Sequence, residues 1–157
     1  MATEKFLGRY FHSLDEKGRV AIPHKFRTIL GGANENKIIV TRSPDSKYTY
    51  LDVYTSAEWD AIQERISTMP IAGDETGELR EALMANFVHN AQDIELDRQG
   101  RILVPTDLRE FAGIEKEVVY TGDGKKFRLW AKSAWEHYDR EMIKLRPKLP
   151  PIPHIVR

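Results

Sequence analysis

The chain contains the same sequence segment twice. Residues 14–31 read LDEKGRVAIPHKFRTILG, and residues 96–113 read LDRQGRILVPTDLREFAG. The offset between them is constant, since 97 − 15 = 82 and 113 − 31 = 82, and seven of the eighteen aligned positions are identical. This internal duplication predicts two copies of one unit related by a pseudo-two-fold axis. Any chemistry carried by the motif therefore occurs twice in each chain.

Within each segment the residue types predict a strand, a tight turn, a second strand and a helix. In the first copy these are residues 9–14, Asp15–Gly18, residues 19–22 and a helix that begins at Pro23 and ends at Gly31. Aspartate bonds its own backbone, glycine supplies positive φ, and proline and glycine favour the two ends of a helix. The second copy predicts the same elements at residues 91–96, 97–100, 101–104 and 105–113.

Each copy ends in a helix that carries an apolar stripe led by tryptophan. The stripes, at offset 76, are Trp59, Ile62, Ile66, Met69 and Trp135, Tyr138, Met142, Leu145. Capping boxes at 55–58 and 133–136 predict where these helices begin. A stripe at positions i, i+3, i+7 and i+10 favours core packing of both tryptophans over stacking on single-stranded nucleic acid.

These patterns predict two repeats joined by a helix. The expected parts are repeat 1 (9–55) with helix 56–69, linking helix 74–90, repeat 2 (91–133) with helix 134–145, and a tail (146–157). Further strands are predicted at 37–41, 50–54, 118–121 and 127–130. The tail holds four of the eight prolines in the chain, so we expect it to run extended, either free or docked on a neighbouring subunit.

Composition excludes several classes of protein. With 41% hydrophobic and 31% charged residues, the chain has the make-up of a globular protein. It holds neither an apolar run of about 18 residues nor a signal-peptide region, and no cysteine for disulfides or thiolate metal sites. Its 24 basic residues balance 24 acidic ones, so only a local patch could bind phosphate. We expect no membrane partner, no cofactor and no small-molecule substrate.

The repeated motif Asp-x-x-x-Gly-Arg is the candidate functional element. If strand, turn and strand form a β-hairpin, its tip projects Arg19 in the first copy and Arg101 in the second. A two-stranded ribbon fits the major groove of DNA, and an arginine fork bonds guanine or phosphate with two donors. The other basic residues expected at DNA are Lys17, Arg98, Lys25, Arg27 and Arg109.

The acidic and glycine positions of the motif are expected to shape the turn. These turn-structuring residues are Asp15, Gly18, Asp97 and Gly100. An alternative interpretation is that aspartate and arginine form only a salt bridge that staples the turn, duplicated along with the unit. A tight turn requires aspartate and glycine, but it does not require two basic residues in both copies.

Catalytic motifs are missing from the sequence. Two symmetry-related aspartates are typical of aspartic proteases, but the Asp-Thr/Ser-Gly context does not occur. The five histidines show no metal-ligand spacing, and neither a Gly-rich phosphate loop nor a Gly-x-Ser-x-Gly is present. We therefore expect neither an enzyme nor a metal site.

The paired LDEKGRVAIP and LDRQGRILVP segments, each followed by a Trp-led helix, resemble the MraZ family of bacterial transcriptional regulators. FLGR at 6–9 and Leu129-Trp130 before Trp135 are similar to the opening and close of that family, and the resemblance covers residues 6–145. The Gly-Arg-x-x-x-Pro portion is shared with the wider AbrB group of DNA binders. Duplication within one chain narrows the resemblance to MraZ.

The resemblance implies an α+β fold, namely a pseudo-two-fold duplicated, swapped-hairpin AbrB-like β-barrel with flanking helices. It also implies a closed ring, commonly an octamer, in the cytoplasm and associated with the nucleoid. Such a ring binds double-stranded DNA at short repeated G-rich promoter boxes and represses its own operon of cell-division and cell-wall functions. Residues 15–19 and 97–101 would carry the binding, chiefly through Arg19 and Arg101. Several subunits on repeated boxes would raise the affinity by about 10²–10⁴.

Two features depart from the symmetric pattern of the family. The turn Arg98-Gln99 differs from Glu16-Lys17, so the copies are expected to contact DNA unequally, and the proline-rich tail lies outside the resemblance. The alternative function is an AbrB-fold structural or protein-interaction ring that acts like an antitoxin. Antitoxins usually carry a disordered segment that wraps the toxin, and the tail here has only twelve residues.

Overall fold

The computed structural model describes residues 5–32, 36–44 and 47–151, which form an α+β fold. The strands are β1 (Arg9–Ser13), β2 (Arg19–Ala21), β3 (Lys37–Arg42), β4 (Leu51–Tyr54), β5 (Gln92–Glu95), β6 (Arg101–Leu103), β7 (Glu117–Gly122) and β8 (Phe127–Ala131). The α-helices are α1 (His24–Gly32), α2 (Ser56–Thr68), α3 (Glu78–Leu83), α4 (Thr106–Ala112) and α5 (Lys132–Lys144). A π-helical turn (Met84–Val88) follows α3, and a 3₁₀ turn (Arg146–Lys148) follows α5.

The strands pair symmetrically with respect to the two copies. One antiparallel sheet has the order β1-β7-β8-β4-β3-β5, and a second contains β2 and β6 alone. The equivalent strands of the two copies are β1 and β5, β2 and β6, β3 and β7, and β4 and β8. When each strand is exchanged for its equivalent, both sheets keep the same order, read from the opposite edge. The register agrees, because Val20 opposes its equivalent Ile102 (102 − 20 = 82) and Asp52 opposes its equivalent Arg128 (128 − 52 = 76). A pseudo-two-fold axis therefore passes through these two residue pairs.

The two strands on either side of each motif turn do not pair with each other. Strand β1 pairs with β7 and β2 with β6, while β5 pairs with β3. The predicted β-hairpins are therefore wrong, although both turns form. The physical reason is burial: pairing β2 with β6 places Val20 and Ile102, each 1% exposed, in a core shared by both copies.

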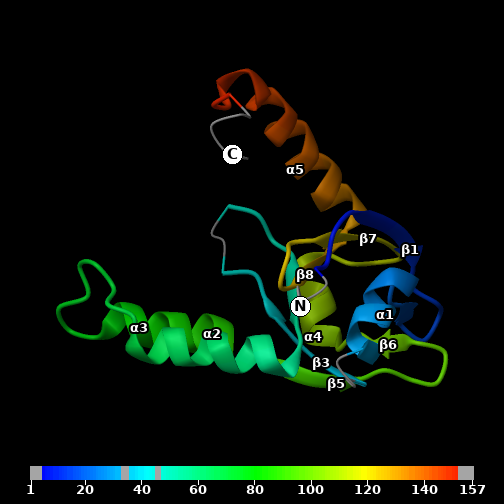
Figure 1. Cartoon of the computed structure of the whole chain (residues 1–157), viewed down its shortest axis with the longest axis horizontal. Helices are drawn as coiled ribbons and strands as arrows, with labels where there is room; N and C mark the ends of the chain where they lie inside the picture. The colour runs from blue at the N-terminus through cyan, green and yellow to red at the C-terminus, as the bar shows by residue number, and fades with distance from the viewer. Residues whose placement is uncertain (1–4, 33–35, 45–46, 152–157) are drawn as a thin grey trace.

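The main apolar core lies between the two sheets and is closed by α1 and α4. It contains Phe26 of α1, Leu108 of α4 and alternate residues of the large sheet, such as Leu51 and Leu129. The outer face of the sheet carries two smaller clusters, one around Trp59 of α2 and one around Trp135 of α5. Core packing of both tryptophans is confirmed. In Figure 1, α2 and α3 form an arm on one side of the sheets, and α5 extends from the sheets in another direction.

The two predicted capping boxes differ in outcome. The first is confirmed in its main contact, because Thr55 is the N-cap of α2 and its hydroxyl accepts the N–H of Glu58 at 3.1 Å. The second is wrong, because α5 begins at Lys132 directly after β8 and its N-cap is Ala131, with no side-chain cap. Strand β8 runs into α5 without a loop, which places Ser133 inside the first turn.

Other boundaries also differ from expectation. Helices α1 and α4 begin at His24 and Thr106, one residue after the predicted Pro23 and Pro105. Helix α1 continues through Gly31 to Gly32, whereas α4 ends at Gly113, with φ of 69°, as predicted. The linking helix is shorter than expected, since α3 starts after Gly77 and changes to the π-helical turn at Met84. The tail begins with the 3₁₀ turn instead of extended chain, and residues 152–157 lie outside the described part. In the described segments, we find no helix with the length and apolarity that crossing a membrane demands.

Candidate nucleic-acid interface

The first motif turn, residues 15–19 (loop 1), is organised by one carboxylate. Asp15 Oδ1 accepts the main-chain N–H groups of Lys17 and Arg19, both at 2.9 Å, and Oδ2 accepts Nε of Arg19 at 2.8 Å. Gly18 has φ of 84°, which glycine adopts without strain, and donates its N–H to the carbonyl oxygen of Asp15 at 3.0 Å. The aspartate thus holds the turn and orients the arginine side chain at the same time.

The second motif turn, residues 97–101 (loop 2), has the same geometry. Asp97 Oδ1 accepts the N–H groups of Gln99 and Arg101 at 2.9 Å, and Oδ2 accepts Nε of Arg101 at 2.9 Å. Gly100 has φ of 76°. Because the two backbones match, the loops differ mainly in the outer side chains, Glu16-Lys17 against Arg98-Gln99, and all four of these residues are exposed.

The two loops lie together on one side of the molecule. Arg101 Nη1 is 3.9 Å from Asp15 Oδ2, so Arg101 lies near the aspartates of both copies. Figure 1 shows both loops beside α1 and β6, away from the arm formed by α2 and α3. The structure therefore brings the two predicted arginines into one site, on a two-stranded ribbon (β2 and β6) to which each copy contributes a strand.

Leu103 of this ribbon was not among the residues predicted from the sequence. Since Ile102 points into the core, its neighbours Arg101 and Leu103 share the outward face, and Leu103 is 55% exposed. The alternation of side chains along this strand was the signal that could have identified Leu103.

Hydrogen bonding lowers the pKa of both loop aspartates. The largest cause for Asp15 is the main-chain N–H of Arg19, aided by the guanidinium of the same residue and the N–H of Lys17. The pKa of Asp97 is lowered chiefly by the N–H of Arg101. Two carboxylates that share a proton would have one raised pKa. The loops therefore hold two ionised acceptors, an arrangement suited to orienting arginines.

The lowered pKa values predict a specific loss of stability in acid. A carboxylate with a depressed folded-state pKa stabilises the fold above its unfolded pKa of about 3.9, and this contribution is lost as the pH falls through the folded value. The double variant Asp15→Asn, Asp97→Asn should therefore be less stable than wild type near neutral pH. We expect this difference to narrow between about pH 5 and pH 2. Urea unfolding at several pH values measures it, and a gap independent of pH would contradict the prediction.

The remaining predicted basic residues fall into two groups. Lys17 and Arg98 are exposed in the loops, and Lys25 is exposed on α1. Arg27 and Arg109, by contrast, are half-buried and lie against the loop of the opposite copy. The equivalent of Lys25 is Asp107, whose carboxylate accepts the side-chain amide of Gln92 at 3.2 and 3.3 Å, so the helices beside the two loops differ in charge.

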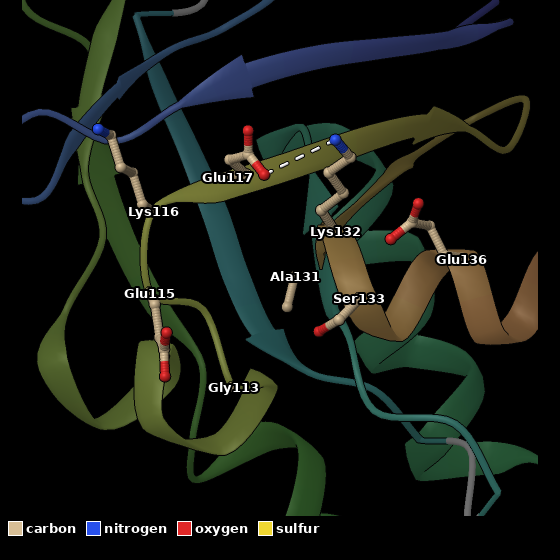
Figure 2. A pocket seen from close by; sticks show the side chains of 8 residues that line it. All are labelled: Gly113, Glu115, Lys116, Glu117, Ala131, Lys132, Ser133 and Glu136. Carbon is tan, nitrogen blue, oxygen red and sulfur yellow. Dashed lines mark ion pairs between the residues drawn. The ribbon is translucent and has the colours of Figure 1, made fainter.

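A groove of different character lies at the start of α5 (Figure 2). Its lining residues are Gly113, Glu115, Lys116, Glu117, Ala131, Lys132, Ser133 and Glu136. Lys132 Nζ and Glu117 Oε2 form an ion pair of 3.7 Å across it. None of the residues predicted at DNA lines this groove. In the three described stretches, no group of three or more His, Asp or Glu side chains is placed to hold a metal ion.

Comparison with known proteins identifies the family. A family model described as "MraZ protein, putative antitoxin-like" matches residues 5–81 and 87–148. The "Transcriptional regulator MraZ" of Caldanaerobacter subterraneus subsp. tengcongensis is 39% identical over 134 residues, or 85% of this chain and 86% of that protein. Its namesake in Pelotomaculum thermopropionicum is 39% identical (85% and 84% covered), and that of Leuconostoc citreum 35% (87% of both). The chain therefore belongs to the MraZ family.

Proposed function

We propose that this chain is a sequence-specific DNA-binding transcriptional regulator that reads DNA with Arg19 and Arg101. The observation that carries the proposal is the pair of neighbouring arginine forks, each oriented by the aspartate of its own loop. The names of its relatives, which are transcriptional regulators, support the same function. The proposed residues at DNA also include Lys17, Arg98 and Lys25.

The geometry of the forks supports base reading. In each arginine Nε is bonded to an aspartate, so the Nη groups are left to meet an acceptor such as guanine O6 and N7, although Nη1 of Arg101 also lies 3.9 Å from Asp15 Oδ2. The side chains are 35% and 30% exposed for Arg19 and Arg101, respectively. Because both are already held in place, less side-chain freedom is lost on binding. Leu103, on the same outward face, offers an apolar contact for a thymine methyl group.

We also propose an assembly and a DNA target for this chain. We assign the fold to the swapped-hairpin AbrB-like barrels and the assembly to a ring, commonly an octamer, in the cytoplasm and at the nucleoid. The target is a set of short repeated promoter boxes, and binding represses the cell-division and cell-wall operon of the chain itself. A ring accounts for tight binding by a chain of zero formal net charge, since linked subunits raise the affinity by about 10²–10⁴ without new contacts.

The decisive experiment is a titration of the purified protein against DNA from upstream of its own gene. A scrambled fragment of equal length is the control, and both are measured at about 50 and 200 mM salt, where purely electrostatic binding weakens steeply. We expect tighter binding to the upstream fragment, with the preference retained at the higher salt concentration.

Equal and salt-sensitive binding to both fragments, or no binding, would refute the proposed regulator. The "antitoxin-like" description of the matching family model would then favour a protein partner. In that case the exposed loop residues become candidates for a protein interface.

A further inference from the structure

The helix that follows each loop lies against the loop of the other copy. Helix α1 follows loop 1, yet its Arg27 donates from Nη1 to the carbonyl oxygen of Gln99 in loop 2, at 3.2 Å. Helix α4 follows loop 2, yet the guanidinium of Arg109 lies over Gly18 of loop 1. This exchange follows from the pairing of β2 with β6, which carries each helix to the opposite side of the pseudo-two-fold axis.

The glycines show how closely each arginine approaches. A Cβ atom built on Gly100 would lie 2.6 Å from Nη1 of Arg27, and one built on Gly18 would lie 3.1 Å from Nη1 of Arg109. Main-chain bonds hold the same glycines to the other copy, since the Gly100 carbonyl oxygen accepts the N–H of Ile22 at 2.9 Å and the Gly18 carbonyl oxygen accepts the N–H of Val104 at 3.3 Å. Each glycine is therefore held between an arginine and the residue that follows β2 or β6, and both of these partners belong to the other copy.

The guanidinium groups of Arg27 and Arg109 are partly buried, as expected of side chains that contact protein and not DNA. In the described part of the chain, the Nε atoms of Arg27 and Arg109 are buried and have no hydrogen-bond partner. The inner part of each guanidinium is therefore enclosed by protein. This differs from Arg19 and Arg101, whose Nε atoms are bonded to exposed aspartates.

We propose that Arg27 and Arg109 are positioning residues, each of which holds the DNA-reading loop of the opposite copy in its binding shape without contacting DNA. The proposal rests on the proposed function for what the loops bind, but the loop contacts themselves exist in the free protein. It also predicts unequal roles. Arg27 bonds loop 2 directly, whereas Arg109 donates from Nη2 to Thr106 of its own helix, at 3.3 Å, and only packs on loop 1.

The test is amide hydrogen exchange in the free protein. Arg27→Met, which removes the hydrogen bond but keeps the stem, should raise exchange at residues 99–101 about two- to tenfold. It should leave exchange at residues 17–19 as in wild type, although those residues are nearer in sequence. Arg109→Met should raise exchange at 17–19 by a smaller factor. The matched control is Lys25→Met, which removes an exposed charge from α1 and should change neither loop.

A second measurement separates positioning from direct contact. The slope of log affinity against log salt falls by about 0.9 for each phosphate contact that is removed. Arg27→Met should weaken binding to upstream DNA with this slope unchanged. A slope reduced by about 0.9 with unchanged exchange in loop 2 would overturn the proposal, since Arg27 would then bind phosphate.

Two further outcomes are decisive. If Arg27→Met does not fold, Arg27→Lys, which keeps the charge and loses the fork, should still raise exchange at residues 99–101, and unchanged exchange would again overturn the proposal. If wild-type protein shows no preference for upstream DNA, the proposed function fails. The exchange experiment then decides the positioning role alone, because it requires no DNA.

Discussion

The double variant Arg19→Ala, Arg101→Ala should lose its preference for upstream DNA while keeping its fold. Each good arginine contact to a base is worth about 1–3 kcal/mol, so each replacement should weaken specific binding about 5- to 150-fold. In the proposed complex, losing both forks also leaves Asp15 and Asp97 facing the DNA without their cationic partners. We therefore expect the double variant to bind upstream and scrambled DNA with similar weak affinity.

The fold should survive because main-chain groups hold the loops. The N–H groups of residues 19 and 101 still reach the aspartates after the side chains are removed. Circular dichroism and urea unfolding check this. The matched control is Arg65→Ala on α2, which breaks an exposed ion pair with Glu58 (3.2 Å) on the arm away from the loops. If the double variant bound upstream DNA with wild-type affinity, the assignment of Arg19 and Arg101 as DNA-reading residues would be refuted. Other residues would then have to bind the DNA.

The substitution Phe26→Ala should lower the stability of the fold strongly. Phe26 is 1% exposed, and its ring contacts four others, those of Phe6, Tyr10, Phe127 and Tyr120, at centroid distances of 5.2, 5.2, 4.7 and 6.5 Å. Removing a buried phenylalanine ring costs about 3–5 kcal/mol of the free energy of unfolding. That is a large share of the roughly 5–15 kcal/mol by which native proteins are stable.

Chemical denaturation in urea measures this loss. The control is Leu103→Ala, at an exposed position of β6, which should change the free energy of unfolding by no more than about 0.5 kcal/mol. A loss below about 1 kcal/mol for Phe26→Ala would mean that the site collapses around the cavity, contrary to the close packing of these five rings.

Local elements were predictable from the sequence because their signals are local. The Asp-x-x-Gly turns, the core-facing Trp59 and the cap at Thr55 depend on residues within a few positions of one another. The orientation of Arg19 by Asp15 belongs to the same class, since both lie in one turn. For such features, side-chain type and spacing carry most of the information needed.

Partner choice was not predictable in the same way. Nothing in residues 19–22 distinguishes a neighbour in the same copy from one 82 positions away, because alternation specifies a face and not a partner strand. The placement of Arg27 over loop 2 depends on that partner choice, so it was missed as well. The second cap failed for a related reason: β8 passes directly into α5, and continuity between two elements has no local signature in Ser133.

The unequal outer residues of the loops have a consequence for evolution. In a dimer of two identical chains, every substitution appears on both sides of the axis, so the two tips remain identical. Here both tips are encoded separately, and a single mutation alters one alone. Glu16-Lys17 and Arg98-Gln99 record such divergence on one shared backbone shape. A target that lies across both loops would therefore meet different side chains at its two ends. The protein could then bind such a target in one preferred orientation.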